Sequence, residues 1–262
     1  MSDLAVDFSR LRRETWLKHV ENHESIGSTN DRGMRLAAES GLPCPALVIA
    51  ERQTAGRGRG ARRWESGFGA LTFSLILDRP ASLPRERTSL VSLIAGLAIR
   101  EAIAGVARGS LVQVKWPNDV YLAGKKVAGI LAETSSAAPD RLVVGIGINV
   151  NNSLDDAPLE IQRRGISLVD HLEGRVEPTD LLVRLFVELE LSVDRLAKIG
   201  GINVDCWRPH CLLTGRDISI RTGSATLTGR CLGVGVDGAI HLESDQGVIP
   251  VYAGEIVSWL PH

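Results

Sequence analysis

The chain has 262 residues and 44% hydrophobic content, enough for one large domain or for one domain with a small companion. Its 30 Lys and Arg nearly balance its 31 Asp and Glu, so it lacks the basic excess typical of general nucleic-acid-binding proteins. Its 4 cysteines form no CxxC pair, which favours reduced thiols over a disulfide framework.

The N-terminal segment lacks the apolar core of a secretion signal. No apolar run looks long enough to span a bilayer. These features predict a cytoplasmic protein without membrane contact. A short basic helix is expected at about residues 8–21, which is too small for a helix-turn-helix domain.

Helix and strand patterns follow in the next part of the chain. Ser28–Asn30 offer N-cap chemistry for a helix that Gly41 ends. The runs ALVIAE (46–51) and ALTFSLILD (70–78) read as buried strands. A long helix is expected from Pro84 to about Val106.

The rest of the chain shows two kinds of sequence pattern, one of longer strands and a helix and one of short strands and turns. Residues 111–136 look like a hairpin with LAGKK at its turn, and RLVVGIGINVNN (141–152) is a further strand. A core helix is expected at about 179–199. From Leu212 several short strands alternate with Gly and Asp turns, which is typical of a small β-barrel. We therefore expect a catalytic domain at 1–211 and a small domain at 212–262.

In the stretch ERQTAGRGRGARRW (51–64), four of the five arginines, Arg57, Arg59, Arg62 and Arg63, lie among or just after three glycines. A dinucleotide loop would match Gly56, Gly58 and Ala61, but it needs a helix directly afterwards. No GK[ST] follows for a P-loop, and aromatic residues for base stacking are only 4% of the chain. We expect a loop that grips phosphate through glycine N–H groups and guanidinium groups and that is mobile until the anion binds.

A second group of polar residues lies in KWPNDVYLAGKK. Lys115 and Asp119 flank a proline turn, and a hairpin would bring Lys126 near Asp119. A lysine amine can neutralise charge that develops on phosphorus, and an aspartate can hold Mg²⁺ or orient an attacking group. The plain alternative for Lys125 and Lys126 is a solvated turn.

Two weaker motifs remain. In GIGINVNN, the glycines could make room for a slender ligand, and Asn149 could bond a base or a phosphate. The segment CWRPHC places Cys206, His210 and Cys211 close together, but a metal site needs more ligands. We expect packing there.

Taken in order, the motifs resemble those of biotin protein ligases. They are STN at 28–30, Gln53 before GRGR and Trp64, KWPND before Lys126 and AGIL, and GIGIN. The resemblance implies an α+β fold, with a catalytic domain like that of class II aminoacyl-tRNA synthetases, built on a mixed β-sheet, plus a small C-terminal SH3-like β-barrel. It also implies two steps: biotin and ATP form biotinyl-5′-AMP, which then acylates one lysine of a biotin carboxyl carrier protein.

The resemblance assigns roles residue by residue. For catalysis it points to Lys126, Arg59, Lys115 and Asp119. For biotin it points to Ser28, Thr29, Asn30, Gln53, Gly56, Arg57, Gly58, Arg59, Trp64, Lys126, Gly129 and Gly145. For ATP it points to Arg57, Arg62, Lys115, Asn118, Lys126 and Asn149. No residue is assigned as a metal ligand, and Mg²⁺ is expected to enter with ATP.

The chain departs from the family pattern in two places. Ala61 stands where the loop usually has glycine, and residues 152–165 have no aromatic to stack on adenine. The segment before Glu24 is too short for the winged helix of the bifunctional relatives, so we expect a ligase without sequence-specific DNA binding; a homodimer is plausible. The alternatives are a lipoate-protein ligase and a non-catalytic biotin-sensing module.

Overall fold

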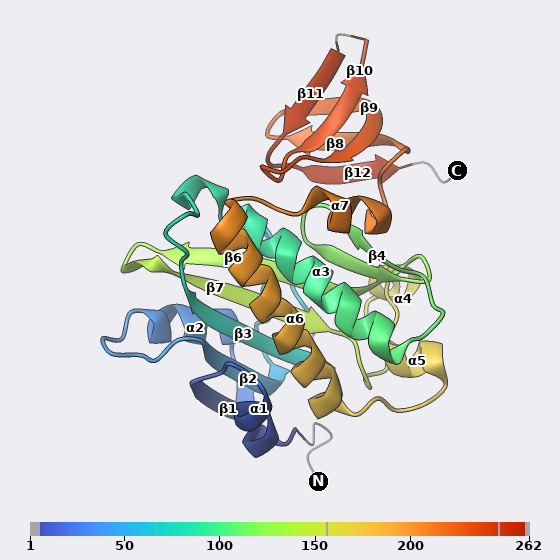
Figure 1. Ribbon diagram of the computed structural model, residues 1–262. Coiled ribbons are helices and arrows are strands. Elements are labelled where there is room, and N and C mark those ends of the chain that lie inside the picture. Colours follow the sequence, from blue (N-terminus) through green and yellow to red (C-terminus); the bar gives the residue numbers. More distant parts are fainter. Residues whose placement is uncertain (1–5, 66, 156, 246, 260–262) are drawn as a thin grey trace.

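Two β-sheets organise the chain (Figure 1), and the computed structural model describes residues 6–65, 67–155, 157–245 and 247–259. The larger sheet has seven strands in the order β1-β2-β3-β7-β6-β5-β4. Strands β1 and β2 are parallel, and every other neighbouring pair is antiparallel, so the sheet is mixed. The strands are β1 (His19–Ile26), β2 (Ala46–Gln53), β3 (Leu71–Asp78), β4 (Val112–Lys115), β5 (Asp119–Leu122), β6 (Lys125–Ser135) and β7 (Ala138–Ile148).

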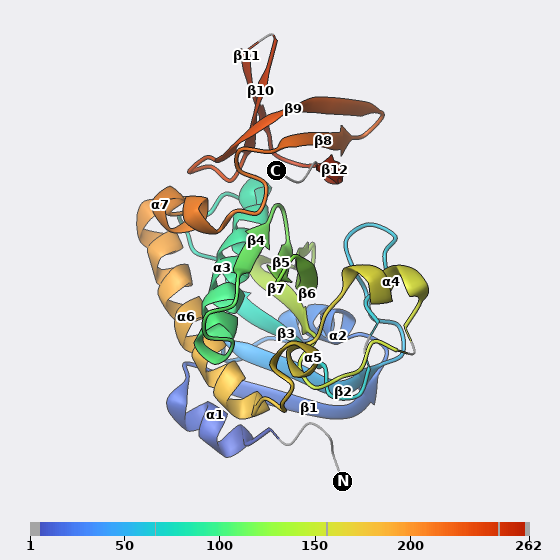
Figure 2. The ribbon, with the colours of Figure 1, turned by 90° about the vertical axis from the view of Figure 1, so that its right-hand side faces the viewer.

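Helices cover both faces of this sheet (Figures 1 and 2). The long helices α3 (Ser89–Val106) and α6 (Pro178–Ile199) pack against one another over one face. Helix α2 (Thr29–Ala37) lies against β2, β3 and β7 on the other face. The shorter helices are α1 (Phe8–Glu14), η1 (Arg85–Arg87), α4 (Leu159–Arg164), α5 (Leu168–Leu172), α7 (Val204–Trp207) and η2 (Arg208–His210).

Local chemistry explains where the helices at the site begin and end. The Ser28 hydroxyl accepts a hydrogen bond from the Asp31 N–H at 3.4 Å and caps α2, as the sequence predicts. Helix α6 starts at Pro178 after the Glu177 cap and stops at Gly200, which has a left-handed φ of 71°. Both ends agree with the capping signals of the sequence.

Two expectations about the N-terminal half are wrong. Helix α1 ends at Glu14, and β1 begins at His19, so residues 8–21 are not one helix. The later part of this segment is a strand instead, because it pairs in parallel with β2. From the sequence we expect no apolar run long enough to span a bilayer, but the segment Arg85–Val106 is long and apolar enough by length and composition, with a mean hydropathy of 1.7 over an 18-residue window. Here most of it is buried, because α3 packs on α6 and on the sheet.

The C-terminal sheet has five antiparallel strands in the order β11-β10-β9-β8-β12. They are β8 (Asp217–Thr222), β9 (Ala225–Val234), β10 (Ile240–Ser244), β11 (Gly247–Val251) and β12 (Glu255–Trp259). The sheet stands at the β4 end of the larger sheet, next to α7 (Figures 1 and 2).

The two sheets share one apolar core. Buried Trp116 and Leu93 belong to the same cluster as Leu213, Ile218 and Ile240. The Trp116 indole N–H also donates to the carbonyl of Gly238 at 3.1 Å. The C-terminal sheet is therefore held against the larger one by buried contacts.

Candidate active site

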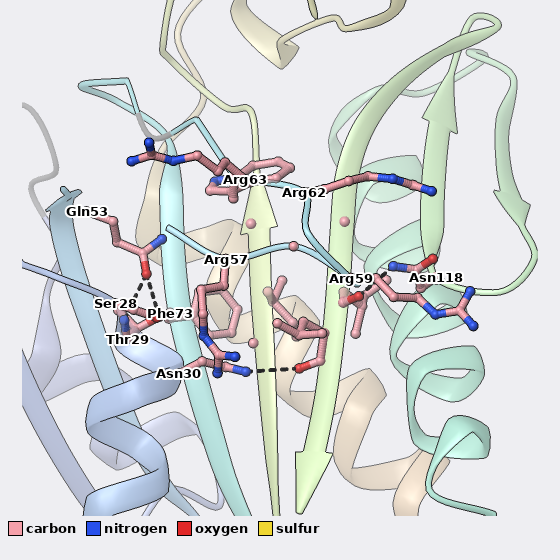
Figure 3. Close-up of a pocket in the computed structure, with 18 of the residues that line it drawn as sticks. Ser28, Thr29, Asn30, Gln53, Arg57, Arg59, Arg62, Arg63, Phe73 and Asn118 are labelled. Atoms are coloured by element: carbon pink, nitrogen blue, oxygen red, sulfur yellow. Dashed lines mark hydrogen bonds between the residues drawn. The ribbon is translucent and has the colours of Figure 1, made fainter. Parts of the chain in front are cut away.

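One pocket gathers most of the predicted site residues (Figure 3); it is partly open, and its space of about 620 Å³ includes open solvent. Its lining includes Ser28, Thr29, Asn30, Gln53, Arg57, Gly58, Arg59, Arg62, Trp64, Asn118, Lys126, Gly129 and Gly145. Figure 3 shows the four arginines on the loop that crosses over the strands, with Gln53 and Ser28 at one end and Asn118 at the other. The loop and the β5–β6 hairpin thus meet over a single cavity.

Buried polar side chains from α2 and β3 form one end of the pocket. The Gln53 side-chain carbonyl accepts from the Thr29 N–H at 2.8 Å and from the Thr29 hydroxyl at 3.1 Å. The Ser74 hydroxyl lies 2.9 Å from the Thr29 hydroxyl and 2.7 Å from the Asn30 side-chain carbonyl. Thr29, Asn30 and Ser74 are all buried, so these bonds fix the polar groups in place.

The arginine loop is itself a small hairpin. The Gly58 N–H donates to the Arg62 carbonyl at 2.8 Å, and the Trp64 N–H donates to the Gly56 carbonyl at 3.1 Å. A Cβ on Gly56 would lie 2.5 Å from the Trp64 carbonyl oxygen, so this position requires glycine. The hairpin presents its guanidinium groups over the sheet.

Acidic and carbonyl groups hold those guanidinium groups. Arg57 forms ion pairs with Asp31 at 2.9 Å and with Glu133 at 2.5 Å. Arg59 donates to the carbonyl of Gly254 at 2.5 Å, and burial lowers the pKa of its guanidinium. These contacts reach the loop from α2, β6 and the C-terminal sheet.

Lys126 and Asp119 face each other across the β5–β6 hairpin, as the sequence predicts. Their Nζ and Oδ1 atoms are 2.5 Å apart. The hairpin turns at Ala123 and Gly124, which both have positive φ, as a two-residue hairpin turn requires. The amine of Lys126 lines the pocket and is partly exposed, so it can reach a ligand there.

Glycines in β6 and β7 make room for pocket side chains. A Cβ on Gly147 would lie 2.2 Å from the Trp64 ring, and one on Gly145 would lie 2.3 Å from Asn30 Oδ1. These glycines therefore make room for protein side chains; they also line the pocket, so the predicted contact with a ligand stays a prediction. The Trp64 side chain lines the pocket, and its indole N–H is buried without a protein partner among the described residues.

Four predicted site residues lie outside the lining. Gly56 shapes the loop, and Asp119 stands behind Lys126. Asn149 is buried and donates to the Ile166 carbonyl at 3.3 Å, a structural contact. Lys115 is 8% exposed, with its ammonium 3.9 Å from the centre of the Trp259 ring. Its charged neighbours include Asp119 and Lys126, so it adjoins the hairpin end of the pocket.

The pocket also contains residues that the sequence interpretation did not assign to the site. They are Arg63, Phe73, Ile130, Leu131 and Ile146, with Ser74 and Glu133 bonded behind the lining. A serine inside the apolar run LTFSLIL was a usable signal for Ser74. The sequence held no such signal for Glu133, because its role is an ion pair with Arg57, which is distant in sequence.

The described residues contain no group of three or more His, Cys, Asp or Glu that could hold a metal ion. In CWRPHC, Cys206 is exposed, whereas Cys211 is buried. Hydrogen bonding to Cys231 lowers the pKa of Cys211 to about 7. The two thiols thus interact with each other inside the shared core.

Comparisons with known proteins agree with this geometry. Residues 23–151 match the biotin/lipoate A/B protein ligase family. The chain is 34% identical over 237 residues to biotin--[acetyl-CoA-carboxylase] ligase of Paracoccus denitrificans, covering 87% of this chain and 96% of that protein. It is 31% identical over 250 residues to the bifunctional ligase/repressor BirA of Bacillus subtilis, covering 94% and 76%.

Solved structures give the same answer for the fold. The biotin protein ligase of Aquifex aeolicus in complex with biotin and ATP superposes with a TM-score of 0.78 at 28% identity, covering 91% of this chain and 97% of that one. The mixed α/β fold is therefore that of biotin protein ligase structures. By its sequence relatives and its fold, the chain belongs to the biotin protein ligases of the biotin/lipoate A/B protein ligase family.

Proposed function

We propose that this protein is an ATP-dependent biotin ligase, which joins biotin to ATP as biotinyl-5′-AMP and then transfers biotin to one lysine of a biotin carboxyl carrier protein. The observation that carries the proposal is the convergence of Arg57, Arg59 and Lys126 on one pocket with the polar network of Thr29 and Gln53. The related Paracoccus enzyme and the Aquifex complex with biotin and ATP support it.

The first step joins two anions. The biotin carboxylate attacks the α-phosphorus of ATP, the bond to the β,γ-pyrophosphate breaks, and pyrophosphate leaves. Positive charge fixed in the site screens the approach and stabilises the charge that builds up on the phosphoryl oxygens. The presence of Lys126, Arg57 and Arg59 in the lining of one pocket supports this role for them.

The polar end of the pocket suits the ureido head of biotin, which has both donors and acceptors. The Gln53 side-chain carbonyl accepts from Thr29, and its NH₂ has no hydrogen-bond partner within the described part of the chain, so it can donate to a ligand. The indole of Trp64, with its N–H unpaired by described protein atoms, forms a wall between the two ends. The arginine loop then shields the labile mixed anhydride from water until the carrier lysine attacks its acyl carbon and AMP leaves.

Mg²⁺ is expected to arrive with ATP, where it would share the charge of the phosphates. Asp119 offers one carboxylate oxygen beyond the one paired with Lys126, which suits a cation held mainly by nucleotide oxygens and water. The chain's own contribution at that point is the Lys126–Asp119 pair, which fixes the amine toward the pocket.

Several finer assignments belong to the same proposal. Strands β8–β12 form the SH3-like domain, with a boundary near Leu212, and the larger sheet resembles a class II synthetase core. A cytoplasmic location without membrane contact also belongs to the proposal, with a homodimer as one possible assembly. Binding to operator DNA is not part of the proposed function; a sequence-specific gel-shift complex at low salt would contradict this part of it.

Pyrophosphate release tests the first step. With ATP and Mg²⁺ present, we expect release to require biotin and not to occur with lipoate. Release that lipoate supports equally would identify a lipoate ligase instead. Biotin binding without any pyrophosphate release would identify a non-catalytic biotin-sensing module.

A further inference from the structure

The last strand of the C-terminal sheet reaches the cationic side of the site. Three of its contacts are with positive groups: the Gly254 carbonyl with Arg59, the Glu255 carboxylate with Arg62, and the Trp259 ring with Lys115. Gly254 precedes β12, and Glu255 and Trp259 are its first and last residues. Residues 254–259 are distant in sequence from the arginine loop and from KWPND. They nevertheless contact positive side chains of both.

The contact with Lys115 is more buried than the ion pair between Arg62 and Glu255. Lys115 is 8% exposed, whereas the side chains of Arg62 and Glu255 are 57% and 41% exposed. An exposed ion pair contributes little, but a buried ammonium needs compensation for its lost hydration. The face of the Trp259 ring, 3.9 Å from Nζ, supplies it, and the Tyr121 ring lies 5.5 Å away.

Trp259 is itself held in place. Its ring meets Tyr121 edge to face at 6.3 Å and 88°, and its backbone pairs with Ile218 of β8. Lys115 in turn stands opposite Asp119 across the β4–β5 hairpin. The ammonium of Lys115 is therefore fixed from two sides, by β5 of the larger sheet and by β12 of the C-terminal sheet.

We propose that Trp259 is a positioning residue for the ATP-dependent step, acting through Lys115. Its ring face holds the Lys115 ammonium charged and aimed toward the hairpin end of the pocket, where the nucleotide phosphates bind. The inference rests on the proposed ligase function and adds to it a role for the C-terminal sheet in the chemistry of the larger domain.

The test compares Trp259→Leu, Trp259→Phe and the control Val257→Ala, which changes an exposed side chain of the same strand. Pyrophosphate release is measured in the full chain with ATP varied at saturating biotin, and biotin affinity is measured by calorimetry without ATP. We expect Trp259→Leu to lower kcat/KM for ATP about 10-fold with unchanged biotin affinity. Trp259→Phe should recover most of the loss, and Val257→Ala should match the wild type.

A pH profile separates positioning from general damage. Lys115 is faced by Asp119 and Tyr121 on β5, Lys126 on β6, Arg62 on the loop and Arg164 on α4, none of which Trp259→Leu removes. Loss of the ring face should therefore move the alkaline limb of kcat/KM for ATP to lower pH.

Three results would decide against the proposal in distinguishable ways. A folded Trp259→Leu variant with wild-type kcat/KM for ATP and an unmoved alkaline limb would overturn it. If Trp259→Leu loses both biotin affinity and ATP-dependent turnover, the role of Trp259 is merely structural, and the proposal is also overturned. An inactive wild type would refute the ligase function itself, and the inference with it.

Discussion

At the scale of single residues, Lys115 gives the site a specific pH dependence. Burial lowers its pKa to about 8, with Lys126 and Arg62 acting in the same direction and Asp119 opposing them. The ammonium is therefore present below about pH 8 and is lost as the pH rises through that value. We expect biotin-dependent pyrophosphate release to decline above about pH 8.

The control for this prediction is Lys115→Arg. A guanidinium stacks well on an aromatic ring and stays charged, so the decline near pH 8 should disappear even if the overall rate is lower. An unchanged decline in that variant would assign the titration to another group. The first step must be measured alone, because the attacking lysine of the carrier also gains activity as the pH rises.

Lys126 gives a second prediction at the same scale. Lys126→Ala removes the amine at the hairpin end of the pocket and should lower the rate of biotinyl-5′-AMP formation by about 10²–10³-fold. The neighbouring exposed Lys125 is the matched control, and Lys125→Ala should leave the rate unchanged. Near-normal turnover by a folded Lys126→Ala variant would remove this residue from the mechanism.

At the scale of elements, the glycines of β7 test the packing of the pocket wall. Gly147→Ala would place a Cβ within 2.2 Å of the Trp64 ring, so the ring must move. We expect weaker biotin binding by calorimetry and a loss of about 1–3 kcal/mol in the free energy of unfolding. Gly174→Ala, where the nearest atom is 3.8 Å away, should change neither quantity; wild-type biotin affinity in Gly147→Ala would place the indole outside the binding site.

The elements also show what the sequence could predict. Helices α2 and α6, strands β2, β3 and β7, and the LAGK hairpin follow from apolar periodicity and capping residues within a few positions of each element. Strand β1 could not be found this way, because HVENHESI is polar and becomes a strand only by pairing with β2. Helices α4 and α5 were also missed, because each is under seven residues long.

The site residues likewise fall into those that the sequence could predict and those that it could not. Motif residues such as Arg57, Gln53 and Lys126 were found because their spacing along the chain is recognisable, and the structure gathers them in one pocket. Their partners Glu133 and Trp259 could not be found from the sequence, because these contacts form only when segments distant in sequence come together in the fold. The mobility expected of the arginine loop remains a prediction.

At the scale of the whole molecule, the shared core predicts cooperative unfolding. Buried residues of both sheets form one cluster, and Trp116 donates to Gly238 between them. We expect one thermal transition, coincident by far-ultraviolet circular dichroism and by tryptophan fluorescence. Trp116→Phe should lower the free energy of unfolding by about 1–3 kcal/mol, since it leaves a buried carbonyl unpaired; two separate transitions in the wild type would contradict a shared core.

The most direct test of the central claim is the intact mass of a biotin carboxyl carrier domain after incubation with this protein, ATP, Mg²⁺ and biotin. We predict a gain of one biotinyl group on a single lysine of the carrier, and no gain when either ATP or biotin is omitted. An unmodified carrier in the complete mixture, with the protein shown to be folded, would contradict the account.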